Sequence, residues 1–153
     1  MNNNDILRRL RFVFDYDDAA MIRIFANANA TITLHELHHW FRKEEDDLFV
    51  SLVDKVFCQF LDGLIIEKRG LREGAEVPKP SSMNNNAIFK KLRIALEMKE
   101  QDIIDVLALA DLNVSSSELG ALFRNPSHKN FKACGDQMLR NFIKGLSLKY
   151  RGM

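Results

Sequence analysis

Apolar side chains recur every three or four residues along most of the chain, and this spacing gathers them on one face of an α-helix. In the first half the pattern predicts four helices, at about residues 4–15, 17–27, 33–42 and 47–62. It returns in the second half, where the fourth helix is expected at about 128–144. Gly63 and Gly145 are expected as left-handed C-terminal caps, and the segments 64–70 and 146–152 beyond them fit either a last helical turn or an extended stretch. The chain is therefore predicted to be all-α.

The second half of the chain is a copy of the first. Residues 83–152 align with residues 1–70 at a constant offset of 82 without insertion or deletion, and 21 of the 70 pairs are identical. The run MNNNDILRRLRF, for example, returns as MNNNAIFKKLRI. A repeat of this regularity indicates two homologous structural units.

We therefore expect two tandem four-helix repeats, 1–70 and 83–153, packed with pseudo-twofold symmetry. The segment 71–82 contains Gly74 and Pro78 and is predicted to link them. A linker of this length reaches at most about 40 Å when extended. The sequence leaves open whether the repeats pack within one chain or exchange between two chains, and a homodimer is compatible with it.

Short polar motifs predict where helices begin. Thr33 and Ser115 each stand three residues before a glutamate, which is the pattern of a capping box. Asn4 and Asn86 are expected to cap the first helix of each repeat.

The near-neutral net charge of +1 hides an opposite bias in the two repeats. Residues 1–70 hold 9 Lys or Arg and 12 Asp or Glu, whereas residues 83–153 hold 11 and 7, so the repeats carry −3 and +4. No apolar run of bilayer length and no signal-peptide pattern appears, so we expect a cytoplasmic protein without membrane contact. Two cysteines, Cys58 and Cys134, are too few for a disulfide framework and are expected to be buried thiols.

The HELHH segment at 35–39 satisfies the H-E-x-x-H pattern of zinc metalloproteases. The second repeat keeps the glutamate, as Glu118, but neither histidine, and capping already accounts for a glutamate at this position. No third ligand stands at a recognisable spacing. We therefore interpret these histidines as surface residues and predict no metal and no cofactor.

No other arrangement typical of an active site is present, because the chain lacks G-x-S-x-G, a glycine-rich phosphate loop and a cysteine within a histidine-bearing signature. We predict that the protein is not an enzyme. The second and third helices match a helix-turn-helix only in part: Val114 and Leu119 have the expected spacing, but the exposed positions carry Ser116, Ser117 and Gly120 rather than base-reading side chains.

Two cationic surfaces remain as candidate binding sites. The first helices keep three cations at matched positions, namely Arg8, Arg9 and Arg11 in the first repeat and Lys90, Lys91 and Arg93 in the second. The predicted fourth helix of the second repeat carries a cationic stripe of Lys129, Lys132, Arg140 and Lys144. Each surface is either a solvated helix face or a contact for an anion or an acidic partner.

Several runs also resemble a known family. NNNAIFKKLRIALEMK, SSSELGALFRNPSHKNFKACGDQMLRNFIKGLSLKYR and, in the first repeat, NNNDILRRLRF and FLDGLIIEKRG resemble the YehS-like bacterial proteins. The resemblance extends over essentially the whole chain and is most distinctive from Ser115 to Arg151. It implies a cytosolic bacterial protein of tandem helical repeats and brings no catalytic residues, because the family has no established activity.

Taken from the residues, the favoured function is a non-enzymatic binding module, most readily a protein-interaction or regulatory adaptor with a protein partner. The alternative is a nucleic-acid-binding protein that contacts the phosphate backbone through its basic helix faces. A pI of about 7.8 argues against this alternative, because nucleic-acid-binding domains often exceed about 9.

Overall fold

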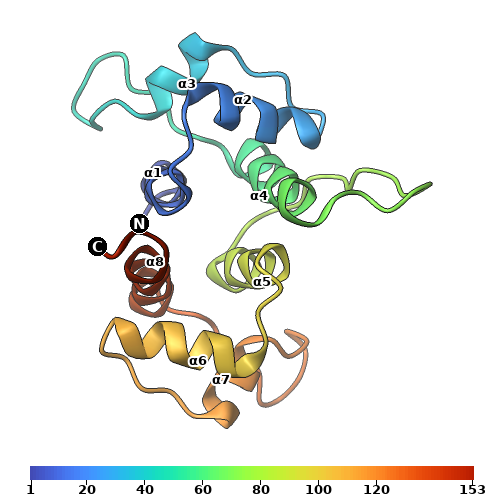
Figure 1. Cartoon of the computed structure of the whole chain (residues 1–153), viewed down its shortest axis with the longest axis vertical. Helices are drawn as coiled ribbons and strands as arrows, with labels where there is room; N and C mark the ends of the chain where they lie inside the picture. The colour runs from blue at the N-terminus through green and yellow to red at the C-terminus, as the bar shows by residue number, and fades with distance from the viewer. The chain divides into compact units, whose positions relative to one another are not determined.

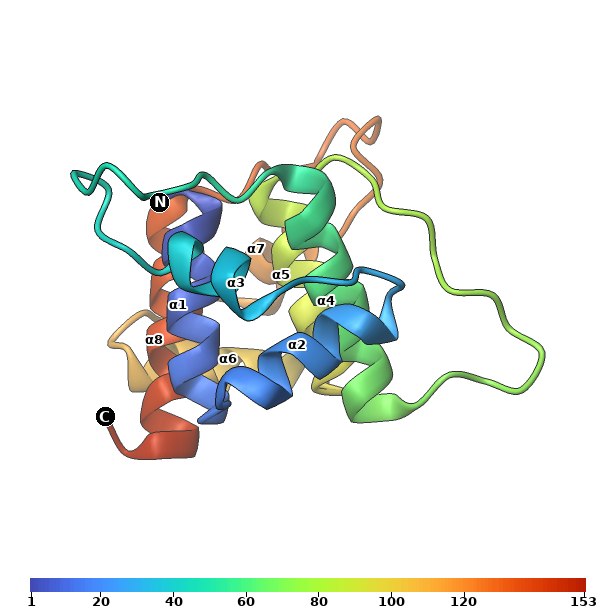
Figure 2. The same cartoon turned by 90° about the horizontal axis from the view of Figure 1, so that it is seen from above.

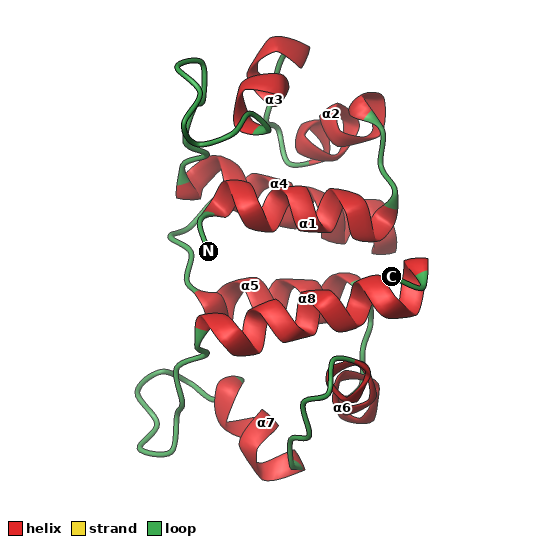
Figure 3. Cartoon of the chain, turned by 90° about the vertical axis from the view of Figure 1, so that its left-hand side faces the viewer, coloured by secondary structure: helices red, strands yellow, loops and turns green.

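The computed structural model describes all 153 residues and contains helices but no strands (Figure 1 and Figure 3). The chain divides into two compact units, Met1–Met83 and Asn84–Met153. The helices of the first unit are α1 (Asn3–Phe14), α2 (Asp18–Asn27), α3 (Leu34–Trp40) and α4 (Asp54–Arg69). Those of the second unit are α5 (Asn85–Ala95), α6 (Glu100–Leu109), α7 (Ser116–Leu122) and α8 (Asp136–Arg151). The predicted all-α fold of two four-helix repeats is confirmed, and the predicted pseudo-twofold packing stays a prediction.

The first helix of each repeat is capped by the first asparagine of its triplet. The side-chain oxygen of Asn2 accepts from the amide of Asp5 at 2.8 Å, and that of Asn84 accepts from the amide of Ala87 at 2.8 Å. The prediction that the third asparagine is the cap was wrong, because that residue lies inside α1 or α5 and its side chain has other partners.

The capping boxes predicted for the third helices are confirmed. The hydroxyl of Thr33 accepts from the amide of Glu36 at 3.0 Å, and the hydroxyl of Ser115 accepts from that of Glu118 at 3.1 Å. Each glutamate carboxylate in turn accepts from the amide of its capping residue, at 3.0 and 3.3 Å. Glu36 and Glu118 therefore stabilise the N-terminal ends of α3 and α7.

Gly63 and Gly145 lie inside the fourth helices, so their predicted role as C-terminal caps was wrong. A Cβ added to Gly63 would stand 1.9 Å from the carbonyl oxygen of Ile24 in α2. One added to Gly145 would stand 2.1 Å from the carbonyl oxygen of Val106 in α6. Glycine is required here because it lets two helix backbones approach closely at their crossing.

The fourth helices continue well beyond these glycines. The segments 64–70 and 146–152, left open by the sequence, form the last turns of α4 and α8. Gly70 and Gly152, with φ of 76° and 73°, stand at the helix ends instead. Glycine adopts a positive φ without the steric strain that other residues have in this conformation.

Aromatic side chains fill the core of each unit. In the first, the ring of Phe25 lies 5.5 Å from Trp40 and 5.2 Å from Phe60, and Trp40 is only 6% exposed. In the second, Phe89 stacks on Phe142 at 4.2 Å. Contacts of α2 with α4, and of α6 with α8, enclose these cores.

Both cysteines are buried and free, as predicted. Burial raises the pKa of the Cys134 thiol to about 11, so this thiol is protonated at neutral pH. The sulfur of Cys58 accepts from the amide of Ser81 at 3.4 Å, which attaches the end of the linking segment to α4.

Candidate binding site in each repeat

Asn4 and Asn86, the residues predicted to be caps, hold the long loop that joins the third and fourth helices. The side-chain nitrogen of Asn4 donates to the backbone carbonyls of Trp40 at 3.0 Å and Val50 at 2.9 Å. The side-chain oxygen of Asn4 accepts from the backbone amide of Leu52 at 2.9 Å. Asn86 makes the same three bonds 82 residues further on, at 2.9, 2.9 and 2.8 Å. One polar side chain thereby fixes the loop against the start of the first helix.

The middle asparagine of each triplet fixes the start of the fourth helix. Asn3 donates to the carbonyl of Leu52 at 3.0 Å and to the carboxylate of Asp54 at 2.8 Å. Asn85 makes the matching bonds at 3.1 and 2.7 Å, the second of them to Asp136. This hydrogen bond from Asn85 is the main cause that lowers the pKa of the Asp136 carboxyl. All three asparagines of each triplet therefore serve the fold.

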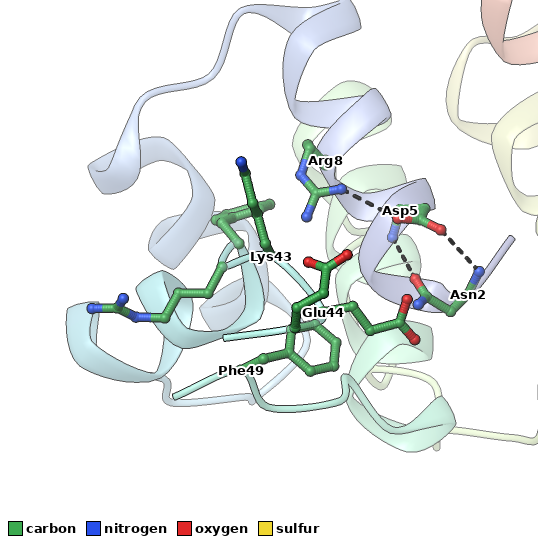
Figure 4. Close-up of a pocket in the computed structure, with 9 residues that line it drawn as sticks. Asn2, Asp5, Arg8, Lys43, Glu44 and Phe49 are labelled. Atoms are coloured by element: carbon green, nitrogen blue, oxygen red, sulfur yellow. Dashed lines mark hydrogen bonds and ion pairs between the residues drawn. The ribbon is translucent and has the colours of Figure 1, made fainter. Parts of the chain in front are cut away.

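An open hollow of about 660 Å³ lies between α1 and the loop of the first repeat. Figure 4 shows Asp5 and Arg8 on α1 facing Glu44 and Phe49 on the loop. Arg8 pairs with Asp5 at 3.2 Å. We call this site the first hollow.

The second repeat has a hollow of about 510 Å³ in the same place. Eight of the nine residues that line the first hollow have their repeat counterpart in the lining of the second. Phe41 and Phe49 form an aromatic wall in the first hollow, and Phe123 and Phe131 form its counterpart in the second. The cations that line the second hollow are Lys90 and Arg124. We call this site the second hollow.

The two hollows differ in their acidic side chains. The first is lined by three carboxylates and three cations, which are Asp5, Glu44, Glu45, Arg8, Arg42 and Lys43. At the positions of the carboxylates the second repeat has Ala87, Pro126 and Ser127. No carboxylate lines the second hollow, whose charged residues are Lys90 and Arg124. The first hollow is thus electrically balanced and the second is cationic.

The two arginines at the loop corners also have different partners. Arg42 pairs with the carboxylate of Asp46 at 3.0 Å. Arg124, its counterpart, donates to the backbone carbonyl of Asn130 at 3.0 Å. A carbonyl leaves the positive charge of Arg124 uncompensated, which strengthens the cationic character of the second hollow.

Of the cations predicted on the first helices, Arg11 and Arg93 are engaged inside the fold. Arg11 donates to the carbonyl of Tyr16 at 3.0 Å, and Arg93 donates to that of Met98 at 3.2 Å. Each guanidinium also lies over an aromatic ring at the loop, 5.0 Å from the centre of Phe41 and 4.7 Å from that of Phe123. These contacts close the turn after the helix, and neither arginine lines a hollow.

Of the remaining four cations of the first helices, two line a hollow and two do not. Arg8 lines the first hollow and Lys90 the second. Arg9 and Lys91 line neither hollow. Only one cation of each predicted trio therefore belongs to a hollow.

The cationic stripe predicted along one helix is divided between a loop and a helix. Lys129 and Lys132 lie in the loop, because α8 begins only at Asp136, whereas Arg140 and Lys144 are helical. The prediction of one continuous helical stripe was wrong because Asn86 binds the backbone at residues 132 and 134 and so holds this stretch outside the helix. Both lysines are exposed on the loop, part of which lines the second hollow.

The HELHH segment forms most of α3, and its side chains have separate partners. The rings of His35 and His39 lie 4.2 Å apart, and Glu36 is bonded in the capping box. His38 contacts the carboxylate of Asp18 at 2.9 Å. No group of three His, Cys, Asp or Glu side chains in the chain is arranged to hold a metal ion.

Asp18 joins this histidine to the first helix. Its other carboxylate oxygen accepts from Arg11 at 2.6 Å. The hydrogen bond with His38, and then that with Arg11, lower the pKa of the Asp18 carboxyl. The arrangement belongs to the first repeat alone, because Glu100 and Gly120 stand at the positions of Asp18 and His38.

Sequence reasoning missed the loop residues of the hollows, although the alignment of the repeats contained a signal for them. The stretch 41–53 diverges strongly from 123–135, yet Phe41, Arg42 and Phe49 return unchanged 82 residues later. These identities fall on residues that line both hollows. Their contact with the first helix depends on tertiary folding and is not encoded by any local spacing.

These features define a class of protein: an all-α protein of two repeats, in which one asparagine per repeat holds a long loop beside an open hollow. The chain belongs to the family described as "Protein of unknown function (DUF1456)", whose pattern matches residues 3–70 and 85–152. It is 42% identical over 150 residues to "Uncharacterized protein YehS" of Escherichia coli (strain K12), covering 97% of this chain and 96% of that protein. No solved structure matches the chain. None of its helices has both the length and the apolar character needed to cross a membrane.

Proposed function

We propose that this protein is a non-enzymatic protein-interaction adaptor whose second hollow binds an acidic segment of a partner protein. The observation that carries the proposal is the difference between two equivalent sites. Both hollows keep a cation on the first helix and an arginine on the loop, but only the first contains carboxylates that offset them. Cations retained in a concave site without internal counter-charges favour an external anion.

The chemistry of the second hollow suits a segment that is both acidic and apolar. Arg124 has five N–H donors and gives one of them to Asn130, so it keeps donors for a carboxylate. Lys90 is exposed on α5 and contributes a mobile ammonium group. Phe123 and Phe131 supply an apolar wall on which a leucine or phenylalanine of the partner would pack.

Binding is favoured over catalysis by the side chains that are present. The lining of the second hollow consists of asparagine, alanine, leucine, phenylalanine, proline, lysine and arginine. Nucleophilic catalysis requires a nucleophile within reach of a base that can take its proton. The asparagines of this lining are neutral, and Asn86 is committed to the loop backbone. This lining supports recognition of a charged group rather than its chemical conversion.

The test is a titration of the purified protein into a fluorescein-labelled peptide of alternating Glu and Leu or Phe residues, followed by anisotropy. Combined substitution Lys90→Glu and Arg124→Glu should weaken binding by at least about tenfold, because it reverses both charges of the site. The matched control, Arg8→Glu with Arg42→Glu, alters the first hollow and should change affinity by less than about twofold. Equal losses in both variants would contradict the proposal.

A second candidate function is binding to the phosphate backbone of a nucleic acid. It is favoured by the exposed Lys129 and Lys132, which extend the charge of Lys90 along the loop of the second repeat. Anisotropy of labelled single-stranded RNA and duplex DNA across salt concentrations tests it. An affinity that falls linearly with salt on logarithmic axes, with a slope that decreases in the Lys129→Ala, Lys132→Ala variant, would establish this function over the first.

A further inference from the structure

We infer that the acidic segment which the second hollow accepts is the acidic loop of a second copy of this chain, defined here as residues 44–50. The inference rests on the proposed function of the second hollow and names its occupant. The two surfaces come from different repeats, and their charge and apolar character are complementary.

The acidic loop carries four consecutive carboxylates, Glu44, Glu45, Asp46 and Asp47. Asp46 is used inside the loop, where it accepts from Arg42 and from the amide of Leu48. Glu44 and Glu45 line the first hollow, and both are exposed, as is Asp47. None of the three carboxylates makes a hydrogen bond or an ion pair within the chain. Three carboxylates of this loop are thus available to an external cationic site.

The same loop exposes apolar side chains beside its carboxylates. Leu48 is 50% exposed and Val50 is 45% exposed, and Val53 just beyond the loop is 59% exposed. The equivalent positions in the second repeat are Asn130, Lys132 and Gly135, so this apolar exposure is not required by the loop's fold. Exposed apolar groups next to acidic ones match a hollow that combines Lys90 and Arg124 with an aromatic wall.

The acidic loop has an ordered shape before any contact. The amide of Asp46 donates to the carbonyl of Lys43 at 2.9 Å, the amide of Phe49 donates to that of Asp46 at 3.0 Å, and Asn4 holds Val50. Figure 2 shows this turquoise loop projecting beyond the helices of its own repeat. A loop that is already folded loses little conformational entropy on docking, which favours association.

The opposite loop has the reverse character. In the second repeat the loop carries Lys129 and Lys132 beside the second hollow, where the first repeat has Asp47 and Val50. The acidic loop of one chain therefore meets a cationic hollow and a cationic loop together. A contact in which one copy uses its loop and the next copy uses its hollow is heterologous. Such contacts continue to further copies unless a reciprocal contact closes a dimer.

Sedimentation velocity tests the inference on the full chain at about 50 mM salt, where charge pairs are screened little. The weight-average mass of the wild-type protein should rise above that of a monomer as its concentration increases through about 10 to 200 µM, the range of weak interfaces. It should fall back at about 500 mM salt. A mass that stays monomeric at every concentration would overturn the inference.

Two charge-reversed variants make the test specific. The loop variant, Glu44→Lys with Glu45→Lys, and the hollow variant, Lys90→Glu with Arg124→Glu, should each associate at least about tenfold more weakly than wild type. An equimolar mixture of the two should regain association, because each loop then faces a hollow of opposite charge. A mixture that stays monomeric overturns the inference. Glu73→Lys with Glu76→Lys, an equal charge change in the linking segment, is the control and should associate like wild type.

The labelled acidic peptide separates this inference from the proposed function. If the wild-type protein binds the peptide but never self-associates, only the identity of the occupant is wrong. If it neither binds the peptide nor self-associates, the proposed function fails as well. If it self-associates and the peptide competes with association, both stand.

Discussion

The two repeats share the contacts that hold their loops and turns and differ in the charged side chains that they present to solvent. Asn4 and Asn86 bind the same three backbone positions at nearly equal distances, and Arg11 and Arg93 close the same turn. The hollow of each repeat keeps its aromatic wall, but the two hollows differ in charge: the first is balanced and the second is cationic. The identities between the repeats therefore mark residues that hold the framework, whereas the differences fall on the charged side chains that line the hollows.

The helix crossings should show the largest effect of any framework substitution. Gly63→Ala and Gly145→Ala each place a Cβ about 2 Å from a backbone carbonyl oxygen of the opposing helix. Because backbone cannot rotate away, each should lower the unfolding free energy by about 3 kcal/mol or more. Urea denaturation measures this loss. Gly120→Ala in α7, where an added Cβ meets nothing within 4 Å, should be neutral or slightly stabilising.

The asparagines that hold the loops should come next, and here the repeats should differ. Asn4→Ala removes three hydrogen bonds at a residue that is 1% exposed, so we expect a loss of about 2–3 kcal/mol. Asn86 makes the same bonds but is only half-buried, so water can replace part of them in Asn86→Ala, and the loss should be smaller. Equal losses in chemical denaturation would show that burial does not distinguish the two sites.

The dependence of folding stability on acidic pH should reveal the contribution of Asp18 and its two partners, a contact that only the first repeat has. The lowered pKa of Asp18 means that its bonds to His38 and Arg11 stabilise the fold above the unfolded pKa of about 3.9, and that this contribution is lost as pH falls through the folded value. The stability difference between wild type and Asp18→Asn should therefore shrink between about pH 5 and pH 2. This stability difference should stay below about 1 kcal/mol at every pH, because the carboxylate of Asp18 is partly exposed.

Thermal unfolding across pH measures this difference. Glu100→Gln, at the equivalent position of α6, is the control for loss of a carboxylate in the first turn of a second helix. A difference for Asp18→Asn that does not change with pH would contradict the role assigned to its two partners.

A single substitution should make the second hollow resemble the first. Ala87→Asp places a carboxylate three residues before Lys90, as Asp5 stands before Arg8. The affinity for the acidic peptide should fall about threefold to fivefold, because one cation is then paired internally. Folding stability should change by no more than about 0.5 kcal/mol, since an acidic residue is favourable in the first turn of a helix. Anisotropy and denaturation measure the two quantities, and a large loss of stability would mean that the affinity change is not electrostatic.

Most of the helices could be predicted from the sequence because the repeat supplied two independent readings of each apolar pattern. The capping boxes at Thr33 and Ser115 were equally local, since both partners lie within one turn. Predictions based on local chemistry failed where the partner is distant in the sequence. Gly63 stands where a helix cap is common, but its true partner, Ile24, lies in another helix.

The candidate site depended still more on distant contacts. Three successive asparagines offer equivalent capping chemistry, and only the position of the loop carbonyls decides that Asn4 holds the loop and Asn2 is the cap. The late start of α8 follows from the bonds of Asn85 and Asn86, which no helical periodicity reveals. The cations were identifiable by sequence, whereas their assignment to a hollow required the folded loop.

Asn4 and Asn86 fix the backbone conformation of their loops without specifying the amino-acid sequence of those loops. Each asparagine binds only backbone atoms, so the side chains between its contacts, at residues 41–49 or 123–131, are not specified by these bonds. Loops of very different sequence therefore keep one conformation: the first reads FRKEEDDLF and the second FRNPSHKNF. After a gene duplication, such a loop is free to acquire new surface chemistry without a new fold, and an engineer could exchange these nine-residue segments as cassettes between repeats.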